Sequence, residues 1–182
     1  MSRVRYAMAI DTHTCVGCTA CVMACKTENN VVEGFNRVWV TQDLQGIFPD
    51  LSLTIQSERC NHCEDAPCVS VCPTGATHVG PGGIVLVDED KCTGCKACIA
   101  ACPYGARFID PRTGTADKCT FCAHRSEHDV YTTACQDVCP TRSIHFGDMN
   151  DPDSDIARVL ATRESYTLLP EAGTSPRLFY LK

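Results

Sequence analysis

The sequence predicts an α+β protein built by duplication into two lobes, with a β-hairpin insertion and an extended C-terminal tail. Three observations lead to this prediction. All sixteen cysteines of the 182 residues fall into four short repeats. A turn and a strand-like segment follow the cysteines of the later repeats. A long segment without cysteine alternates polar and apolar residues on both sides of a turn, as a β-hairpin does.

Each repeat contains four cysteines, with three residues between the last two, and in the first three repeats the first three cysteines are also closely spaced. In chain order the repeats are Cys15, Cys18, Cys21 and Cys25; Cys60, Cys63, Cys68 and Cys72; Cys92, Cys95, Cys98 and Cys102; and Cys119, Cys122, Cys135 and Cys139. A proline follows the last cysteine except in the first repeat, where Lys26 takes its place. The segments TGATHV, YGARFI and TRSIHF then read as a turn and a short strand. We therefore predict the order loop, short helix, turn and strand.

The spacing in DKCTGCKACIAACPYGA is typical of iron–sulfur ligation. A [4Fe–4S] cluster needs one thiolate at each of four iron corners, and a C-x₂-C-x₂-C loop reaches three of them. The chain then enters a helix that carries the fourth cysteine away, so in two-cluster ferredoxins that cysteine binds the neighbouring cluster. We therefore expect a duplicated bacterial ferredoxin-like fold with two lobes and two [4Fe–4S] clusters in each lobe.

Such an exchange of ligands requires the repeats to act in pairs. The second and third repeats are adjacent and pair naturally, so the first and fourth must pair around them. The predicted ligand sets are Cys15, Cys18, Cys21 with Cys139; Cys119, Cys122, Cys135 with Cys25; Cys60, Cys63, Cys68 with Cys102; and Cys92, Cys95, Cys98 with Cys72. This pairing predicts an inner lobe inserted into an outer one.

The predicted divisions follow from these pairs. They are an outer lobe at 1–30 and 111–147, a β-hairpin at 31–56, an inner lobe at 57–110, and a helix with an extended tail at 148–182. Trp39 in the hairpin is interpreted as a packing residue rather than an electron relay. Ser154 or Asp155 is expected to cap the helix. The tail is expected to expose Phe179 and Tyr180, either along the protein's own surface or in a groove on a partner.

Disulfides and zinc are the competing interpretations of the cysteines. The tight CxxC clusters, together with the lack of an apolar secretory segment near the start, argue against a disulfide scaffold. Structural zinc favours two CxxC knuckles separated by a longer span. Only the fourth repeat, with twelve residues between Cys122 and Cys135, resembles a zinc site by itself, and its CxxxCP ending argues against zinc.

The formal net charge of −6 disfavours binding to nucleic acid, and no apolar run is long enough for a membrane span. Four clusters at about −2 each would bring the total to about −14. Eight basic residues stand near the motifs, either as ordinary surface charge or as groups that tune reduction potentials: Lys26, Arg59, Lys91, Lys96, Arg107, Lys118, Arg125 and Arg142. His62, His124 and the other histidines are interpreted as structural. No dinucleotide, P-loop or nucleophile-elbow motif is present, so we expect no catalysis from this protein alone.

The complete pattern resembles the four-cluster iron–sulfur subunits of the dimethyl sulfoxide reductase superfamily. The segments YAMAID, CVGCTACVMACKTENNV, DKCTFCAHR and PRLFYL look most like the electron-transfer subunit of polysulfide reductase. The resemblance covers essentially the whole chain and implies single-electron relay through four [4Fe–4S] clusters. Some relatives replace the second cysteine of the third repeat; Cys95 stands there in this chain, so four cubane clusters are expected.

The same resemblance implies two partners, a catalytic subunit with a molybdopterin (Mo/W) site and an integral-membrane subunit that exchanges electrons with quinol. It places the first and fourth repeats toward the catalytic subunit. It also implies membrane association through these partners, on the periplasmic side by co-export with the catalytic subunit, or alternatively on the cytoplasmic side. The competing functions are a free-standing soluble polyferredoxin and, less favoured, a zinc-stapled interaction module.

Overall fold

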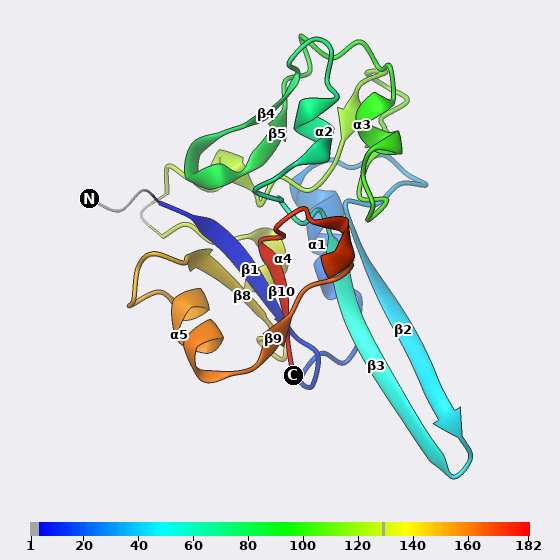
Figure 1. The fold of residues 1–182 in the computed structure, drawn as a ribbon, viewed down its shortest axis with the longest axis vertical. Helices are drawn as coiled ribbons and strands as arrows, with labels where there is room; N and C mark the ends of the chain where they lie inside the picture. The colour runs from blue at the N-terminus through cyan, green and yellow to red at the C-terminus, as the bar shows by residue number, and fades with distance from the viewer. Residues whose placement is uncertain (1–3, 129) are drawn as a thin grey trace.

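The computed structural model describes residues 4–128 and 130–182; residues 1–3 and 129, which fall in the predicted outer lobe, lie outside the described residues. The fold is a mixture of short helices and small sheets (Figure 1). The largest sheet has four strands in the order β8-β1-β10-β9. Its strands are β1 (Tyr6–Asp11), β8 (Ile144–Asp148), β9 (Ser165–Tyr166) and β10 (Leu178–Leu181).

Both ends of the described chain meet in this sheet. Strand β1 pairs in parallel with β10, with Met8 opposite Leu178, and antiparallel with β8. Helix α5 (Asp155–Thr162) packs on β8 and β1. The Ser154 hydroxyl accepts a hydrogen bond from the Ala157 backbone N–H at 3.2 Å, so of the two predicted candidates Ser154 is the N-cap.

The prediction that the C-terminal tail exposes Phe179 and Tyr180 is wrong. The segment is extended, but it forms β10 inside the sheet, where Tyr180 is fully buried and Phe179 is half-buried. Leu178 and Tyr180 face the main core, whereas Leu181 and Phe179 pack in a second cluster with Ile156 of α5. A strand covered on both faces reads as an uninterrupted apolar run rather than an alternating one, which explains the run LFYL.

Each cysteine repeat carries a helix, and three repeats continue into a strand. The helices are α1 (Ala20–Glu28), α2 (Pro67–Ser70), α3 (Ala97–Ala100) and α4 (Ala134–Asp137). The strands that follow the prolines are β4 (Thr77–Val79), β6 (Phe108–Ile109) and β8; β4 pairs with β5 (Val85–Val87), and β6 with β7 (Ala116–Asp117). Three 3₁₀ turns, η1 (Pro81–Gly83), η2 (Ala123–Arg125) and η3 (Pro170–Ala172), complete the described elements.

The first repeat differs in the length of its helix. Helix α1 has nine residues, whereas α2, α3 and α4 have four each. In the other three repeats a proline follows the last cysteine, and the helix ends before it because proline lacks the N–H that the next turn requires. Lys26 stands at this position in the first repeat, so α1 continues through it to Glu28.

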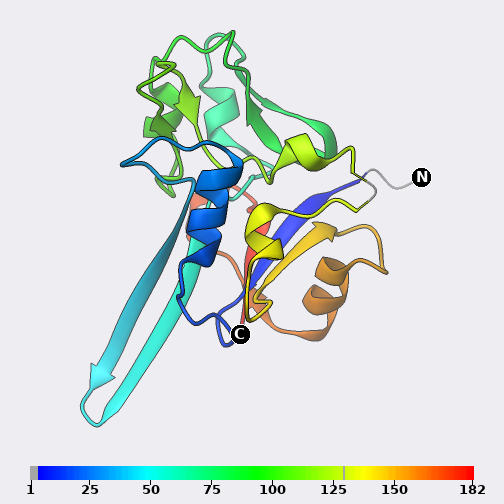
Figure 2. The same cartoon turned by 180° about the vertical axis from the view of Figure 1, so that it is seen from behind.

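A long antiparallel hairpin joins β2 (Val38–Ile47) and β3 (Asp50–Arg59) and projects from the body of the molecule (Figures 1 and 2). Its base is buried and Trp39 packs against the main core. Strand β3 continues three residues past 56, the predicted end of the hairpin, because Arg59 pairs with Val38 within the core. No helix among residues 4–128 and 130–182 is long and apolar enough to span a bilayer.

Candidate metal centres

Three groups of four cysteine thiols line three separate cavities. Each cavity takes three cysteines from one repeat and the fourth from another. The groups are Cys15, Cys18, Cys21 and Cys139; Cys119, Cys122, Cys135 and Cys25; and Cys92, Cys95, Cys98 and Cys72. The grouping follows from the packing of the helices, since α1 lies against α4 and α2 lies against α3.

The remaining cysteines, Cys60, Cys63, Cys68 and Cys102, also influence one another. Burial, opposed by a hydrogen bond from Thr174 and assisted by the nearby Cys60, Cys68 and Cys102, raises the pKa of the Cys63 thiol to about 11. We refer to the four groups by their repeats: the first-repeat group contains Cys15, the fourth-repeat group Cys119, the second-repeat group Cys60 and the third-repeat group Cys92. Within the described residues, no three His, Cys, Asp or Glu side chains are placed to hold a single metal ion.

The four loops share one backbone feature. The residue just before the second cysteine of each repeat adopts a left-handed conformation, with φ of 67° at Gly17, 43° at His62, 66° at Gly94 and 51° at Phe121. Glycine adopts this conformation without strain, whereas histidine and phenylalanine do so rarely. His62 and Phe121 are held there because their rings stack on each other with centroids 3.7 Å apart in the core.

Backbone N–H groups also point at the thiols. The N–H of Phe121 donates to Cys119 Sγ at 3.4 Å, that of Thr77 to Cys72 Sγ at 3.3 Å, and that of Ser143 to Cys139 Sγ at 3.3 Å. The Thr77 bond lowers the pKa of Cys72 to about 7. Hydrogen bonds of this kind stabilise a sulfur atom that carries negative charge.

Other thiols are buried so deeply that they stay protonated as free groups. Burial raises the pKa of Cys25 to about 12 and also raises the pKa of Cys119. A thiolate at such a position requires a positive charge to replace its proton, which is what coordination to iron supplies. The thiol-lined cavities therefore fit a metal cluster.

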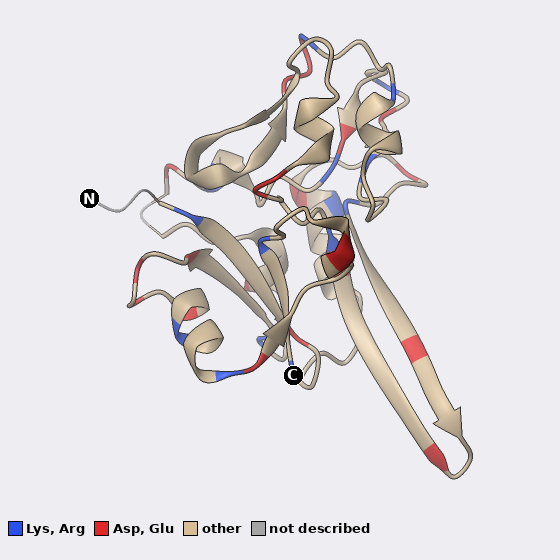
Figure 3. Ribbon diagram, in the orientation of Figure 1, with Lys and Arg blue, Asp and Glu red and all other residues tan. Residues whose placement is uncertain are grey.

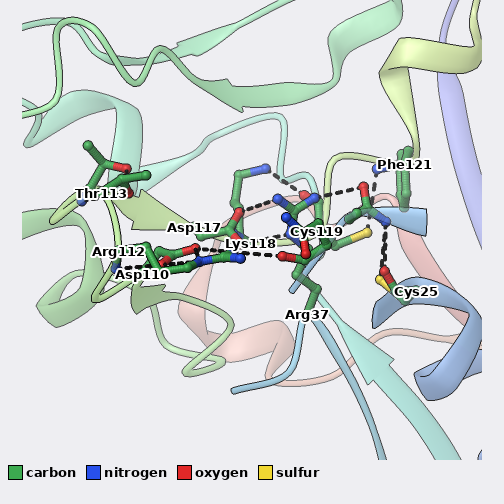
Figure 4. Close-up of polar contacts among 12 residues, drawn as sticks. Cys25, Arg37, Asp110, Arg112, Thr113, Asp117, Lys118, Cys119 and Phe121 are labelled. Atoms are coloured by element: carbon green, nitrogen blue, oxygen red, sulfur yellow. Dashed lines mark hydrogen bonds and ion pairs between the residues drawn. The ribbon is translucent and has the colours of Figure 1, made fainter. Parts of the chain in front are cut away.

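Three buried cations lie among the thiol groups. Arg59 is fully buried, Lys118 is 1% exposed and Arg107 is 6% exposed. Arg59 Nη1 donates to Cys135 Sγ at 2.9 Å, and Arg107 Nη2 donates to Cys68 Sγ at 2.9 Å. Lys118 Nζ donates to the carbonyls of Val85 and Cys119 (Figure 4). The thiol groups thus already have positive charge beside them in the interior.

The electrostatics of Arg59 fit a negatively charged group in the adjoining cavities. Burial opposes its charge, but Cys135, Cys119 and Cys21, when ionised, outweigh burial and raise the pKa of Arg59. Its Nε atom is buried and has no hydrogen-bond acceptor among the described residues. A buried donor of this kind suits an additional acceptor, such as a sulfide of a cluster.

Two other basic residues near the motifs, Arg125 and Lys91, form ion pairs with carboxylates instead. Arg125 forms ion pairs with Glu28 at 2.6 Å and with Asp137 at 2.7 Å. Lys91, whose side chain is 63% exposed, pairs with Asp88. Some basic residues near the motifs are therefore buried beside thiols, and others lie in ion pairs nearer the surface. A position next to a cysteine in the sequence does not tell these two kinds apart.

The two histidines beside cysteines fit the structural interpretation. His62 Nδ1 accepts a hydrogen bond from the Val85 N–H at 3.1 Å, and burial, with Lys118 and Arg107 nearby, keeps its pKa well below the usual value. His124 pairs with Glu28 at 2.7 Å at the surface.

Two hydroxyl groups near the thiols were not identified from the sequence. Ser57 Oγ lies 3.4 Å from Cys21 Sγ, and Thr77 Oγ1 accepts from Arg107 at 3.3 Å. No spacing rule marks these residues, because Ser57 reaches its cysteine across 36 residues of sequence.

Comparison with known proteins gives a consistent result. Residues 51–149 match a family described as 4Fe–4S dicluster domains, and residues 14–76 match a second family with the same description. The chain is 45% identical to protein NrfC of Escherichia coli K12 over 178 residues, which cover 97% of this chain and 80% of that protein. It is 44% identical over 177 residues to one of the chains of the polysulfide reductase of Wolinella succinogenes, covering 96% of this sequence and 93% of that one.

A subunit of the tetrathionate reductase of Salmonella typhimurium is similar to the same extent, with 45% identity over 184 residues, which cover 98% of this chain and 73% of that one. The similarity to each of the three relatives covers 96–98% of this chain. On these grounds the protein is a member of the 4Fe–4S dicluster family of ferredoxin-like iron–sulfur proteins.

Proposed function

We propose that the chain is the non-catalytic electron-transfer subunit of an anaerobic respiratory reductase. It would relay single electrons between a quinol-linked membrane subunit and a molybdopterin (Mo/W) catalytic subunit of the polysulfide or thiosulfate type. The observation that carries this proposal is the set of thiol-lined cavities, in a protein whose relatives include subunits of polysulfide and tetrathionate reductases.

The cysteines would hold four [4Fe–4S] clusters, one in each thiol group. Bound clusters of this type supply reversible uptake and release of one electron each. The ligand sets proposed are Cys15, Cys18, Cys21 and Cys139; Cys119, Cys122, Cys135 and Cys25; Cys60, Cys63, Cys68 and Cys102; and Cys92, Cys95, Cys98 and Cys72. The shared left-handed loops support an origin by duplication, with an outer lobe at 1–30 and 111–147, an inner lobe at 57–110 and the hairpin inserted between them.

The exposure of the thiols suggests where electrons enter and leave. Cys18 of the first-repeat group and Cys95 of the third-repeat group are exposed. All four thiols of the fourth-repeat group are buried, and the second-repeat group has three buried thiols and one half-buried thiol. We therefore propose that the first-repeat and third-repeat groups are the two ends of the relay and that the other two groups are interior.

The hairpin offers a docking surface beside the first-repeat group, since Val40 and Ser57 of the hairpin line that cavity. Its far end exposes a set of apolar side chains: Leu44 (64%), Ile47 (85%), Phe48 (83%), Leu51 (50%) and Leu53 (54%). The only charged residues between 38 and 57 are Asp43 and Asp50 (Figure 3). We propose that the catalytic subunit covers this end with an apolar surface bordered by basic residues.

The docking proposal is tested by the variants Ile47→Asp and Phe48→Asp. Burying one such side chain contributes about 1.5–3 kcal/mol, so each variant should weaken association with the catalytic subunit on the order of tenfold to a hundredfold. Val130→Asp is the matched control, because Val130 is 75% exposed away from the hairpin. Equal effects of all three variants would exclude the hairpin as the docking surface.

The function itself is tested by anaerobic purification from the membranes of the native host, followed by metal analysis. About sixteen irons per chain, with molybdenum or tungsten and two partner chains, is the expected result. The same iron content in a lone soluble protein would establish the free-standing polyferredoxin instead. Protease accessibility of the protein in sealed, right-side-out vesicles distinguishes the proposed periplasmic side from the cytoplasmic side.

A further inference from the structure

Arg59 lies between two thiol groups and contacts both. Its Nη1 atom donates directly to Cys135 Sγ of the fourth-repeat group at 2.9 Å. Its Nη2 atom donates to Ser57 Oγ at 2.5 Å, and that hydroxyl lies 3.4 Å from Cys21 Sγ of the first-repeat group. Arg59 therefore has one direct contact with sulfur and one contact through a hydroxyl.

Arg107 repeats this arrangement at the other pair of groups. Its Nη2 atom donates directly to Cys68 Sγ of the second-repeat group at 2.9 Å. Its Nη1 atom donates to Thr77 Oγ1 at 3.3 Å, and the Thr77 backbone N–H donates to Cys72 Sγ of the third-repeat group at 3.3 Å. The two arginines come from unrelated places in the sequence, Arg59 from the end of β3 and Arg107 from just before β6.

Lys118 occupies the remaining junction. Its amino group donates to the carbonyl of Cys119 at 2.8 Å, and burial lowers its pKa although the sulfur atoms of Cys60, Cys119 and Cys68 lie near enough to oppose this shift. Basic side chains and thiol groups therefore alternate in one series: first-repeat group, Arg59, fourth-repeat group, Lys118, second-repeat group, Arg107, third-repeat group. Both ends of the series are the groups with an exposed thiol.

A buried cation in such a position favours the reduced state of a neighbouring cluster. Reduction adds one negative charge, and a positive charge in a poorly screened interior stabilises that charge more than it would in water. Hydrogen bonds to a ligand sulfur act in the same direction and are a recognised control of cluster potential. The guanidinium group is suited to this role because it stays charged even when buried.

We propose that Arg59 and Arg107 set the reduction potentials within the two pairs of clusters. Each arginine raises the potential of both clusters beside it, and it raises more strongly the one whose cysteine sulfur it contacts directly. Arg59 thus raises the reduction potential of the fourth-repeat cluster more than that of the first-repeat cluster. Arg107 likewise raises the potential of the second-repeat cluster more than that of the third-repeat cluster. This inference rests on the proposed presence of four clusters, but not on the identity of any partner subunit.

The test is a redox titration of the purified iron-loaded protein, followed by electron paramagnetic resonance, with Arg59→Met and Arg107→Met. In Arg59→Met, we expect the ratio of reduced to oxidised fourth-repeat cluster to fall about tenfold at a fixed applied potential, which is about 59 mV for a one-electron couple. The first-repeat cluster should shift less, and the other two should not shift. Arg107→Met should give the matching pattern at the second-repeat and third-repeat clusters.

Two further variants separate tuning from simple structural damage. Arg59→Lys keeps the positive charge, so the ratio of reduced to oxidised fourth-repeat cluster should stay much closer to that of the unmodified protein than in Arg59→Met. Ser57→Ala removes the contact with Cys21 and should shift the first-repeat cluster more than the fourth-repeat cluster. Lys91→Met is the control, because Lys91 is adjacent to Cys92 but its side chain is 63% exposed, so it should change no ratio more than about twofold.

Equal shifts at all four clusters in Arg59→Met, or no shift with full iron content, would overturn the proposal. If Arg59→Met loses iron, the test uses Arg59→Lys and Ser57→Ala instead. The proposal is refuted if neither variant shifts the potential of one cluster more than those of the others. A protein with full iron content but no catalytic or membrane partner refutes the respiratory-subunit function alone, since the four potentials are measured on the isolated protein.

Discussion

The first-repeat and fourth-repeat thiol groups adjoin one region of the molecule, the other two groups lie in a second region, and the two regions are stabilised in different ways. We define the sheet region as β1, β8, β9, β10 and α5, and the ladder region as residues 60–118. The sheet region has a four-stranded sheet that buries Met8, Ile10, Leu178 and Tyr180 completely. In the ladder region the strands have only three or two residues and the helices only four.

The cores of the two regions differ in composition as well. The sheet region adds an aromatic cluster in which Phe146 stacks on Tyr6 and meets Tyr131 edge-on, with ring centroids 5.6 and 4.9 Å apart. The ladder region has a separate core of six buried residues, three of which are cysteines: Cys63, Ala66, Cys68, Val85, Cys98 and Ala116. The sheet region therefore also has a buried cluster without cysteine (Ala7, Ala9, Ile156 and Leu181), whereas half of the separate ladder core consists of cysteines.

The largest expected difference between the regions appears on removal of iron. Because metal binding supplies folding free energy where little other core exists, the ladder region should open in the iron-free protein. Its amides should exchange with a local opening free energy of about 0 kcal/mol, while β1 and β10 stay protected. Hydrogen exchange followed by mass spectrometry measures both regions in one sample. Equal loss of protection in the two regions would contradict the comparison.

Two matched cysteine variants test how far each region depends on its bound iron. They also test the proposed exchange of the fourth cysteine between repeats. Cys102→Ser should destroy the cluster on Cys60, Cys63 and Cys68, a loss of about four of about sixteen irons, and should also open the ladder region. Cys139→Ser should remove a similar amount of iron from the first-repeat group, but the sheet region should remain protected. Iron analysis and hydrogen exchange check both outcomes. Loss confined to the cluster on Cys92, Cys95 and Cys98 in Cys102→Ser would refute the proposed pairing.

The same two regions show what the sequence can predict. Local patterns identify the cysteine loops, the helices and strands that follow them, the hairpin, and Ser154 as one of two candidate caps, because each depends on neighbouring residues. The four-stranded sheet was not predicted, since the pairing of β1 with β10 joins residues 8 and 178 and no local pattern records it. The burial of Tyr180 was missed for the same reason.

The local sequence also does not predict which basic residues are buried against the thiols. Arg59, Arg107 and Lys91 all stand near cysteines in the sequence, yet only the first two are buried against the thiols. One signal in the loops was overlooked. Gly17 and Gly94 precede the second cysteine of two repeats, which indicates a left-handed residue at the equivalent positions of His62 and Phe121.

A moderate effect is expected from acid on the sheet region. Asp11 of β1 pairs with Arg163; burial favours the neutral carboxyl, but the hydrogen bond and charge of Arg163, together with hydrogen bonds from His13 and Thr14, outweigh burial and lower the pKa of Asp11 to about 2. The folded-state pKa lies below the unfolded value of about 3.9, so the pair stabilises the fold above that pH and loses its effect as the pH falls toward 2. Asp11→Asn should therefore cost about 2 kcal/mol at pH 7 and little near pH 2. Urea unfolding of the iron-loaded protein at several pH values measures this difference, and a constant difference at all pH values would exclude the ion pair as its cause.

The smallest expected effect comes from removing the N-cap of α5. This change tests whether iron binding depends on the stability of the sheet region. Ser154→Ala removes the hydroxyl that accepts from Ala157, at a cost of about 1 kcal/mol, whereas Ser154→Gly costs only a few tenths. Helix α5 covers the sheet with Ile156 and packs mainly on β8 and β1, so neither variant should change the iron content or any cluster potential. Thermal unfolding and iron analysis of the two variants supply the comparison. Loss of iron from the first-repeat group in Ser154→Ala would mean that this group depends on the marginal stability of the sheet, and the contrast between the two regions would then be one of degree only.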